Sequence, residues 1–314
     1  MAIGSGIGSQ LGIATETTFN TAVTVTRFYE FTNESINYNK VTAVGLGLRA
    51  GGQVPRSQRR VVTTSDATGD ITLDLPTKGL GLLLAHAMGS FPTKTGGSFT
   101  FTLGDIYTKS FTSQVGVPQY GGTVTPKTIG GCKISSWELG VSNAGIATGR
   151  FSVDGASFTT GTSLATASYS STTNLFHFAQ GAVTVDGSSV ANIKDFTLTV
   201  DNVIKSDRYN LGAAGVKAEQ VINGFRKVSG SITAEFTDTV LLTKFLADTS
   251  TGLALTFTSG SDVLSITASA VKFDGEAPQV GGPEVIDVNF TFEAYDNGTD
   301  APLTIVYTTT DTSL

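Results

Sequence analysis

Hydrophobic and polar positions alternate with the two-residue period of β-strands over much of the chain. The stretch Gly69–Gly89 shows this clearly, because three apolar residues alternate with threonine and aspartate before Pro76. Proline has no N–H to donate and ends the predicted strand. Apolar residues then recur at helical spacing. We therefore predict a helix over residues 78–88, capped by Thr77 and ended by Gly89.

The same strand–helix pattern returns at Gly230–Asp248, which we interpret as the second copy of an internal duplication. A basic pair precedes each copy and a Thr/Phe-rich strand follows each. The basic pairs are Arg59-Arg60 and Arg226-Lys227, and the strands are Phe99–Leu103 and Leu253–Thr258. The first copy has about six more residues between its basic pair and its strand, which predicts an inserted loop there.

The composition agrees with a sheet protein that is large enough for two domains. The chain has 314 residues, of which 39% are hydrophobic, only 15% are charged and 37 are glycine. We predict a mainly β fold of two tandem β-sandwich or half-barrel domains, each flanked by one short α-helix. The predicted first domain, 1–157, has an N-terminal arm over Met1–Asn20 and a basic loop, 37–61. A linker, 158–174, follows it. The predicted second domain, 175–314, has a basic loop, 204–227, and a C-terminal strand or arm.

Half of the 20 basic residues gather in those two loops. They are Lys40, Arg49, Arg56, Arg59, Arg60, Lys205, Arg208, Lys217, Arg226 and Lys227. The remainder of the chain carries 10 basic residues against 24 acidic ones. A basic segment can contact nucleic acid or an acidic protein surface. We favour protein contact, because no aromatic side chains accompany the arginines and the rest of the molecule is acidic.

The sequence offers no convincing catalytic, cofactor or metal site. Its two histidines, His86 and His177, lie among apolar residues without a nucleophile and an orienting group in a recognisable pattern. Cys132 follows two glycines at a predicted strand and is interpreted as a small buried residue. The glycine clusters lack nucleotide-loop spacing, and the acidic turn 296–300 lacks calcium-loop spacing. We expect no enzyme activity and no cofactor.

One cysteine excludes an intrachain disulfide and fits a reducing compartment. The first ten residues have neither the basic nor the apolar region of a secretory signal, and no apolar run approaches the length of a membrane helix. We expect a subunit that is made soluble and does not insert into membranes.

A colinear set of segments resembles the tail tube (major tail) proteins of long, non-contractile-tailed, siphovirus-like bacteriophages. Each segment is weak alone, but together they extend in order over nearly the whole chain. The segments are Gly12–Val25, Leu48–Val61, Gly69–Gly89, Gly131–Glu138, Phe196–Tyr209, Val228–Phe236 and Lys272–Gly282.

The resemblance implies a structural virion protein whose rings stack into a tail tube, the channel for DNA ejection. Inner strands would join into one barrel around that channel. Family rings have six tube-fold units, so two units per chain imply a homotrimeric ring with pseudo-sixfold symmetry. A homohexamer with one tube unit and one decorating domain is the alternative. Implied partners are the tail terminator, baseplate or distal tail proteins, the tape-measure protein in the lumen, and passing genomic DNA without sequence-specific binding.

In this picture the ten basic residues contact the next ring, whose body is acidic. The candidate lumen acids are Asp74, Glu138, Asp201, Glu235 and Glu293. The protein would reside in the virion tail after assembly in the host cell cytoplasm. A capsid decoration protein, another β-rich virion or adhesion protein, and a related secretion-system tube protein remain alternatives.

Overall fold

The computed structural model describes residues 4–170 and 173–314, and within them the chain is mainly β. Strands account for 49% of the residues and helices for 9%, which confirms the predicted fold class. The first half contains β1 (Gln10–Thr15), β2 (Arg27–Tyr29), β3 (Asn33–Glu34), β4 (Asn37–Val44), β5 (Arg60–Asp74), α1 (Gly81–Met88), β6 (Ser98–Thr102), β7 (Phe111–Pro118), β8 (Val124–Val141), β9 (Thr148–Gly155) and β10 (Ser157–Thr159).

The second half begins after the residues that follow β10. It contains β11 (Gly181–Val185), β12 (Ser188–Val190), β13 (Ile193–Asp201), β14 (Ile204–Lys205), β15 (Val221–Ile222), β16 (Lys227–Glu235), α2 (Val240–Ala247), β17 (Thr251–Ser259), β18 (Asp262–Gly275), β19 (Asp287–Ala294) and β20 (Leu303–Thr308).

The two halves pair their strands in the same order. Each half has an outer sheet, β2-β1-β7-β8-β10 in the first and β12-β11-β17-β18-β20 in the second. Each half also has four antiparallel wall strands, β4-β5-β9-β8 and β13-β16-β19-β18. The long strands β8 and β18 occupy the same place in both lists, because each belongs to an outer sheet with its first part and to the wall with its second.

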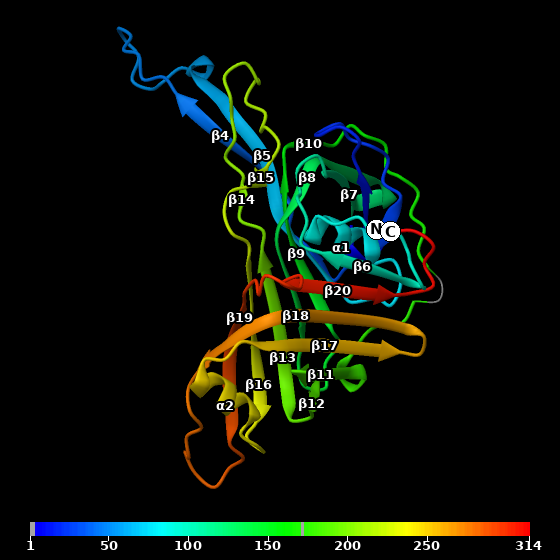
Figure 1. Ribbon diagram of the computed structural model, residues 1–314. Helices are drawn as coiled ribbons and strands as arrows, with labels where there is room; N and C mark the ends of the chain where they lie inside the picture. Colours follow the sequence, from blue (N-terminus) through cyan, green and yellow to red (C-terminus); the bar gives the residue numbers. More distant parts are fainter. Residues whose placement is uncertain (1–3, 171–172) are drawn as a thin grey trace.

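Two strand pairs join the halves. The end of β8 pairs with β13, so that Leu139 lies opposite Leu198, and β20 pairs with β6. The first junction fuses the wall strands into one sheet of order β4-β5-β9-β8-β13-β16-β19-β18, here called the wall sheet. Figure 1 shows its central strands side by side, with the β4–β5 hairpin extending beyond the body of the molecule.

One face of the wall sheet is apolar and packs against the rest of the chain. Trp137, Phe151 and Phe290 are almost fully buried there, and the buried side chains of both halves form a single cluster. Gly69 and Gly230 hold corresponding places on β5 and β16. A Cβ at either residue would lie within 2.4 Å of a backbone oxygen of the preceding strand, so only glycine fits.

The two helices occur where the sequence predicts them, with small differences at the start of the first. Helix α1 begins at Gly81, later than expected, because Gly79 has a positive φ of 84°, which is not helical; the backbone N–H groups of Thr77 and Gly79 bond to Asn174 and Asp311. The predicted cap by Thr77 is wrong, since Leu80 holds the capping position without a side-chain bond. Both helices end at a residue in the left-handed conformation, Gly89 (φ 69°) after α1 and Asp248 (φ 48°) after α2.

The expectation of an extended basic loop over 37–61 is wrong. Strand β4 and the first residues of β5 form a regular antiparallel hairpin, and only residues 45–59 between them make its tip. Side chains on both faces of this hairpin are exposed, including Val41 and Val61 at 61% and 53%. The hairpin is therefore held together by hydrogen bonds between its own two strands rather than by packing. For this reason no alternation of apolar and polar residues indicates it in the sequence.

The two halves of the chain also align with each other differently from what the sequence indicated. The pairs Asn39–Asp66 and Asp201–Lys227 occupy the same place in the two halves, so the connecting segments 40–65 and 202–226 differ by one residue in length. The expected six-residue insertion is therefore absent. The first half instead has extra chain after α1. There β6 pairs with β20, and β7, not Phe99–Leu103, is the counterpart of β17.

The chain ends are parts of the sheets rather than arms. Strand β1 lies between β2 and β7 with Leu11 and Ile13 fully buried, which corrects the expected arm over Met1–Asn20. Strand β20 lies between β18 and β6, so it is neither an arm nor an edge strand. Residues 1–3 of the expected arm and 171–172 of the expected linker lie outside the described residues. The first residues of that linker belong to β10.

Candidate functional site

Five acidic residues lie on the polar face of the wall sheet, the face opposite the core. They come one each from β5, β8, β13, β16 and β19: Asp74, Glu138, Asp201, Glu235 and Glu293. Glu138 illustrates the geometry, because it is exposed between Trp137 and Leu139, which are both buried. Side chains alternate between faces along a strand, so the sheet brings together carboxylates that are far apart in the sequence.

Further charged groups on this face are paired with one another. Arg150 lies 2.6 Å from Asp70, and Lys194 lies 3.0 Å from Glu235 and 2.8 Å from Asp287. Partial burial acts to raise the pKa of Asp70, but hydrogen bonds from Ser152 and Arg150 outweigh it and hold the pKa below its ordinary value. The face thus presents carboxylates and hydroxyls, with these two cations neutralised by neighbouring acids.

The first basic segment forms a separate exposed surface, here called the basic hairpin (residues 37–65). Lys40, Arg49, Arg56, Arg59 and Arg60 are all exposed on it. Its tip also carries exposed apolar side chains, with Leu46 at 78%, Leu48 at 104% and Val54 at 79%. In Figure 1 the hairpin extends well away from the sheets of the body. Apolar groups rimmed by one sign of charge are typical of a protein-binding surface.

The second basic segment is folded onto the first half of the same chain. Lys217 is 2% exposed and lies 2.5 Å from Asp154 and 3.0 Å from Asp66. Arg226 donates to the Met88 and Gly104 carbonyls, and Arg208 to the Glu219 carbonyl. Lys205 pairs with Asp207, and Lys227 is exposed. Arg208, Lys217 and Arg226 therefore differ in environment from the exposed residues of the basic hairpin, whereas Lys205 and Lys227 are exposed like them.

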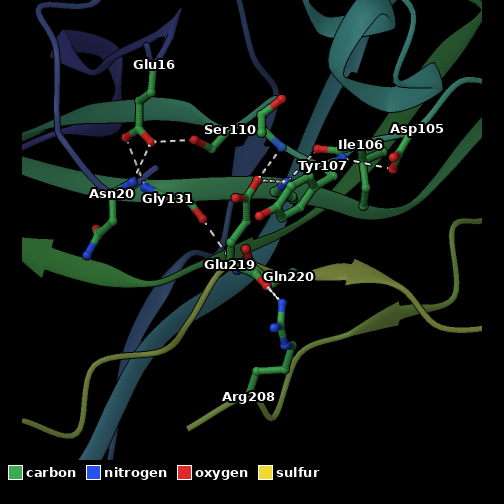
Figure 2. Close-up of polar contacts among 12 residues, drawn as sticks. Glu16, Asn20, Asp105, Ile106, Tyr107, Ser110, Gly131, Arg208, Glu219 and Gln220 are labelled. Carbon is green, nitrogen blue, oxygen red and sulfur yellow. Dashed lines mark hydrogen bonds and ion pairs between the residues drawn. The ribbon is translucent and has the colours of Figure 1, made fainter. Parts of the chain in front are cut away.

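Two carboxylates, the buried Glu16 and the half-buried Glu219, accept hydrogen bonds from several loops (Figure 2). Glu16 accepts hydrogen bonds from the Asn20 and Gly131 backbones at 2.9 Å and from the Ser110 hydroxyl at 2.7 Å. Glu219 accepts from the backbone of Thr108 at 2.5 Å and from Lys133 at 2.6 Å.

Burial acts to lower the pKa of the Lys133 ammonium, and this effect outweighs the hydrogen bond that Lys133 donates to Glu219. Sequence reasoning missed Glu16, Lys133 and Glu219, because most of their partners are dozens of residues away and no local pattern indicates such pairing. The contacts of Glu219 with Thr108 and Lys133 join the second half to the first.

The residues that were weighed as catalytic candidates are packed into the core. His86 is 3% exposed, and burial lowers its pKa to about 3 while Thr15 lies 3.0 Å from its Nε2. Cys132 is fully buried, which raises the pKa of its thiol. Among residues 4–170 and 173–314, no group of three or more potential metal-ligating side chains is assembled. None of the described helices is long and apolar enough to cross a lipid bilayer.

Comparison with protein families gives a match over nearly the whole chain. The profile described as "Phage tail tube protein" covers residues 6–294. The chain belongs to the phage tail tube protein family. This confirms the resemblance that the colinear segments indicate. A search of curated proteins found no match.

Membership of the tail tube family establishes the role at a coarse level. Such a protein is a structural component of the virion tail, its subunits associate with copies of themselves into a tube, and the family is not an enzyme family.

Proposed function

We propose that three copies of this tail tube protein close into a ring of six tube-fold units, and that stacked rings form the channel through which genomic DNA leaves the particle. The pairing of β8 with β13 carries the proposal. It joins two copies of one strand order inside a single chain, and it leaves β4 and β18 as the two margins of the wall sheet.

The two margins are counterparts of the strands that already pair. Strand β4 corresponds to β13, and β18 corresponds to β8, so β18 of one copy and β4 of the next can repeat the junction seen between the halves. The part of β8 that pairs with β13 corresponds to residues 274–279, of which the first two end β18 and the others follow it. We infer that these residues extend β18 against residues 34–39 of the adjacent copy.

Ring closure also resolves a physical liability of the free subunit. An open sheet margin with unpaired backbone groups promotes uncontrolled strand addition, and a closed ring has no such margin. Two units per chain and six units per ring give a homotrimer with pseudo-sixfold symmetry, and internal duplication accounts for the matching halves. A homohexamer is the competing stoichiometry.

In this ring the polar face of the wall sheet would line the channel. Asp74, Glu138, Asp201, Glu235 and Glu293 would then repel DNA phosphates and keep the duplex mobile. The tip of the basic hairpin, with Arg49, Arg56 and Arg59, would contact the acidic body of the next ring. Head-to-tail contacts of this kind do not close and so generate a filament.

The remaining expected partners belong to the same proposal. The tape-measure protein would occupy the channel during assembly in the host cytoplasm, and the tail terminator and the baseplate or distal tail proteins would bind the two ends of the tube. Each of these contacts follows from the proposed open-ended stack of rings, whose terminal rings have one unoccupied face.

Electron microscopy and native mass spectrometry of the purified chain, with tube growth initiated where necessary, test the proposal together. We expect rings of three chains with a sixfold-like outline that stack into hollow tubes. Rings of six chains would contradict the trimer and the use of both halves in the wall. Particles that remain monomeric with or without an initiator would contradict ring formation itself.

A further inference from the structure

Helix α1 is closed at its C-terminal end by residues of the second half. Asn202 donates from its side chain to the Ala87 carbonyl at 3.0 Å and to the Ile134 carbonyl at 2.8 Å. Arg226 donates to the Met88 carbonyl at 3.3 Å. Asn202 and Arg226 are the first and last residues of the segment that connects β13 to β16. All eight residues of α1 are buried as a result of this and other packing.

Helix α2 has no such cover within the chain. Leu246 is the counterpart of Ala87, two residues before the left-handed end of its helix, but its side chain is 69% exposed. Val240 is 42% exposed, and only Leu241 is buried. Among the described residues, none donates a hydrogen bond to the carbonyl of Leu246 or Ala247. The last carbonyls of a helix carry partial negative charge and need donors.

The strand registers show which residue takes the place of Asn202. Asp201 pairs with Lys227 at the end of β13, and Asn39 pairs with Asp66 on β4, so the residue after Asn39, Lys40, is the counterpart of Asn202. The same comparison applied to β8 and β18 makes Phe273 the counterpart of Ile134. Across the seam Phe273 would therefore lie beside Lys40, as Ile134 lies beside Asn202.

We propose that Lys40 of one copy docks against the C-terminal end of α2 of the adjacent copy, and so locks the seam between them. This inference rests on the proposed ring. An ammonium group is well suited to this place, because it can donate to the last carbonyls of a helix and complements their partial negative charge. Lys40 is exposed in the single chain, so its side chain is not already committed to the core.

The second copy is the occupant that the charges favour. The basic hairpin contains no acidic residue between Lys40 and Arg60, whereas α2 ends at the acidic residue Asp248, which pairs with Lys272 of its own chain. The in-chain contact at α1 provides the geometric precedent, and the apolar surface of Leu246 would be covered in the same step.

Charge reversal tests the lock on intact protein. Lys40→Glu should raise the concentration needed for half-maximal ring formation at least tenfold, as followed by sedimentation velocity. Lys40→Asn introduces the residue found at the counterpart position, Asn202, and should assemble nearly as well as the wild-type chain. Arg49→Glu is the matched control. It makes the same charge change at the hairpin tip, which lies beyond the lock, and should leave ring formation unchanged while weakening stacking.

The outcomes separate the lock from the ring. Normal rings from Lys40→Glu, or a Lys40→Asn variant no better than Lys40→Glu, would overturn the lock and leave the ring intact. A wild-type chain that forms no three-chain ring would overturn both.

Discussion

The two helices occupy matching positions in matching strand orders, yet their surroundings are opposite. Helix α1 is buried along its whole length, between its own sheets and the residues of the second half that close its C-terminal end. Helix α2 buries one residue, and Leu246 at its end is 69% exposed. The residues that face the sheet are alike, since Leu82 and its counterpart Leu241 are 8% and 5% exposed.

This difference shows that the two halves are not equally covered. The second half of the chain covers the first half, whereas the second half has no equivalent neighbour within the described residues. A fold that is complete on one side and incomplete on the other is suited to repeated addition of copies. Variants at covered and at uncovered positions should therefore affect the isolated chain very differently.

The largest contrast is expected between two lysines. Lys217→Ala should lower the free energy of unfolding by about 3–5 kcal/mol, because it leaves Asp154 buried without its partner. Lys272→Ala, which removes an exposed pair with Asp248, should leave the urea midpoint nearly unchanged. Urea unfolding of both variants measures the contrast. Lys217→Met combined with Asp154→Asn should recover part of the loss, and equal effects of the two single variants would refute the contrast.

A smaller contrast is expected between two leucines. Leu83→Ala in α1 opens a cavity in the core and should cost about 3 kcal/mol in the isolated chain. Leu246→Ala in α2 removes an exposed side chain and should change stability by less than about 0.5 kcal/mol. Thermal or urea unfolding of dilute, unassembled protein is the measurement. A large loss from Leu246→Ala under those conditions would mean that α2 is already covered in the single chain.

The smallest contrast concerns the change of folding stability with pH. Burial lowers the pKa of His86 to about 3, so the unfolded chain binds a proton that the folded chain excludes as the pH falls from about 6.5 toward 3. His86 should therefore cost the fold about 2 kcal/mol at pH 5 relative to pH 7. His86→Phe introduces the residue found at the counterpart position in α2, Phe245, and should flatten this part of the stability curve. An unchanged slope between pH 7 and pH 5 would show that other groups produce it.

The local pattern of apolar and polar residues predicted the parts of the fold that depend on residues near one another in the sequence. The alternation after Gly69 and after Gly230, the helices that follow, and the hairpin turn at Asp186-Gly187 were all readable from the chain, because each depends on neighbouring residues. Strand β1 was missed, since its glycine-rich surroundings resemble those of an arm. The β4–β5 hairpin was missed because neither of its faces is buried.

The candidate site was only partly readable for a related reason. Five acids could be placed on strands from their alternation, and the wall sheet then places them on one face. The burial of Lys217 could not be anticipated, because Asp66 and Asp154, which neutralise it, belong to other strands far away in the chain. Pairing between buried charges that are far apart in the sequence cannot be inferred from the spacing of residues within one segment.

The continuity of the chain through the β8–β13 junction has a kinetic consequence for building the proposed ring. Half of the six joints exist before any collision takes place, because the peptide backbone holds their partners at high effective concentration. Only the remaining three must be made by diffusing molecules, each of which loses its freedom of translation and rotation. A duplicated gene product of this kind would reach closure in fewer encounters than six separate units, and every second joint would withstand dilution.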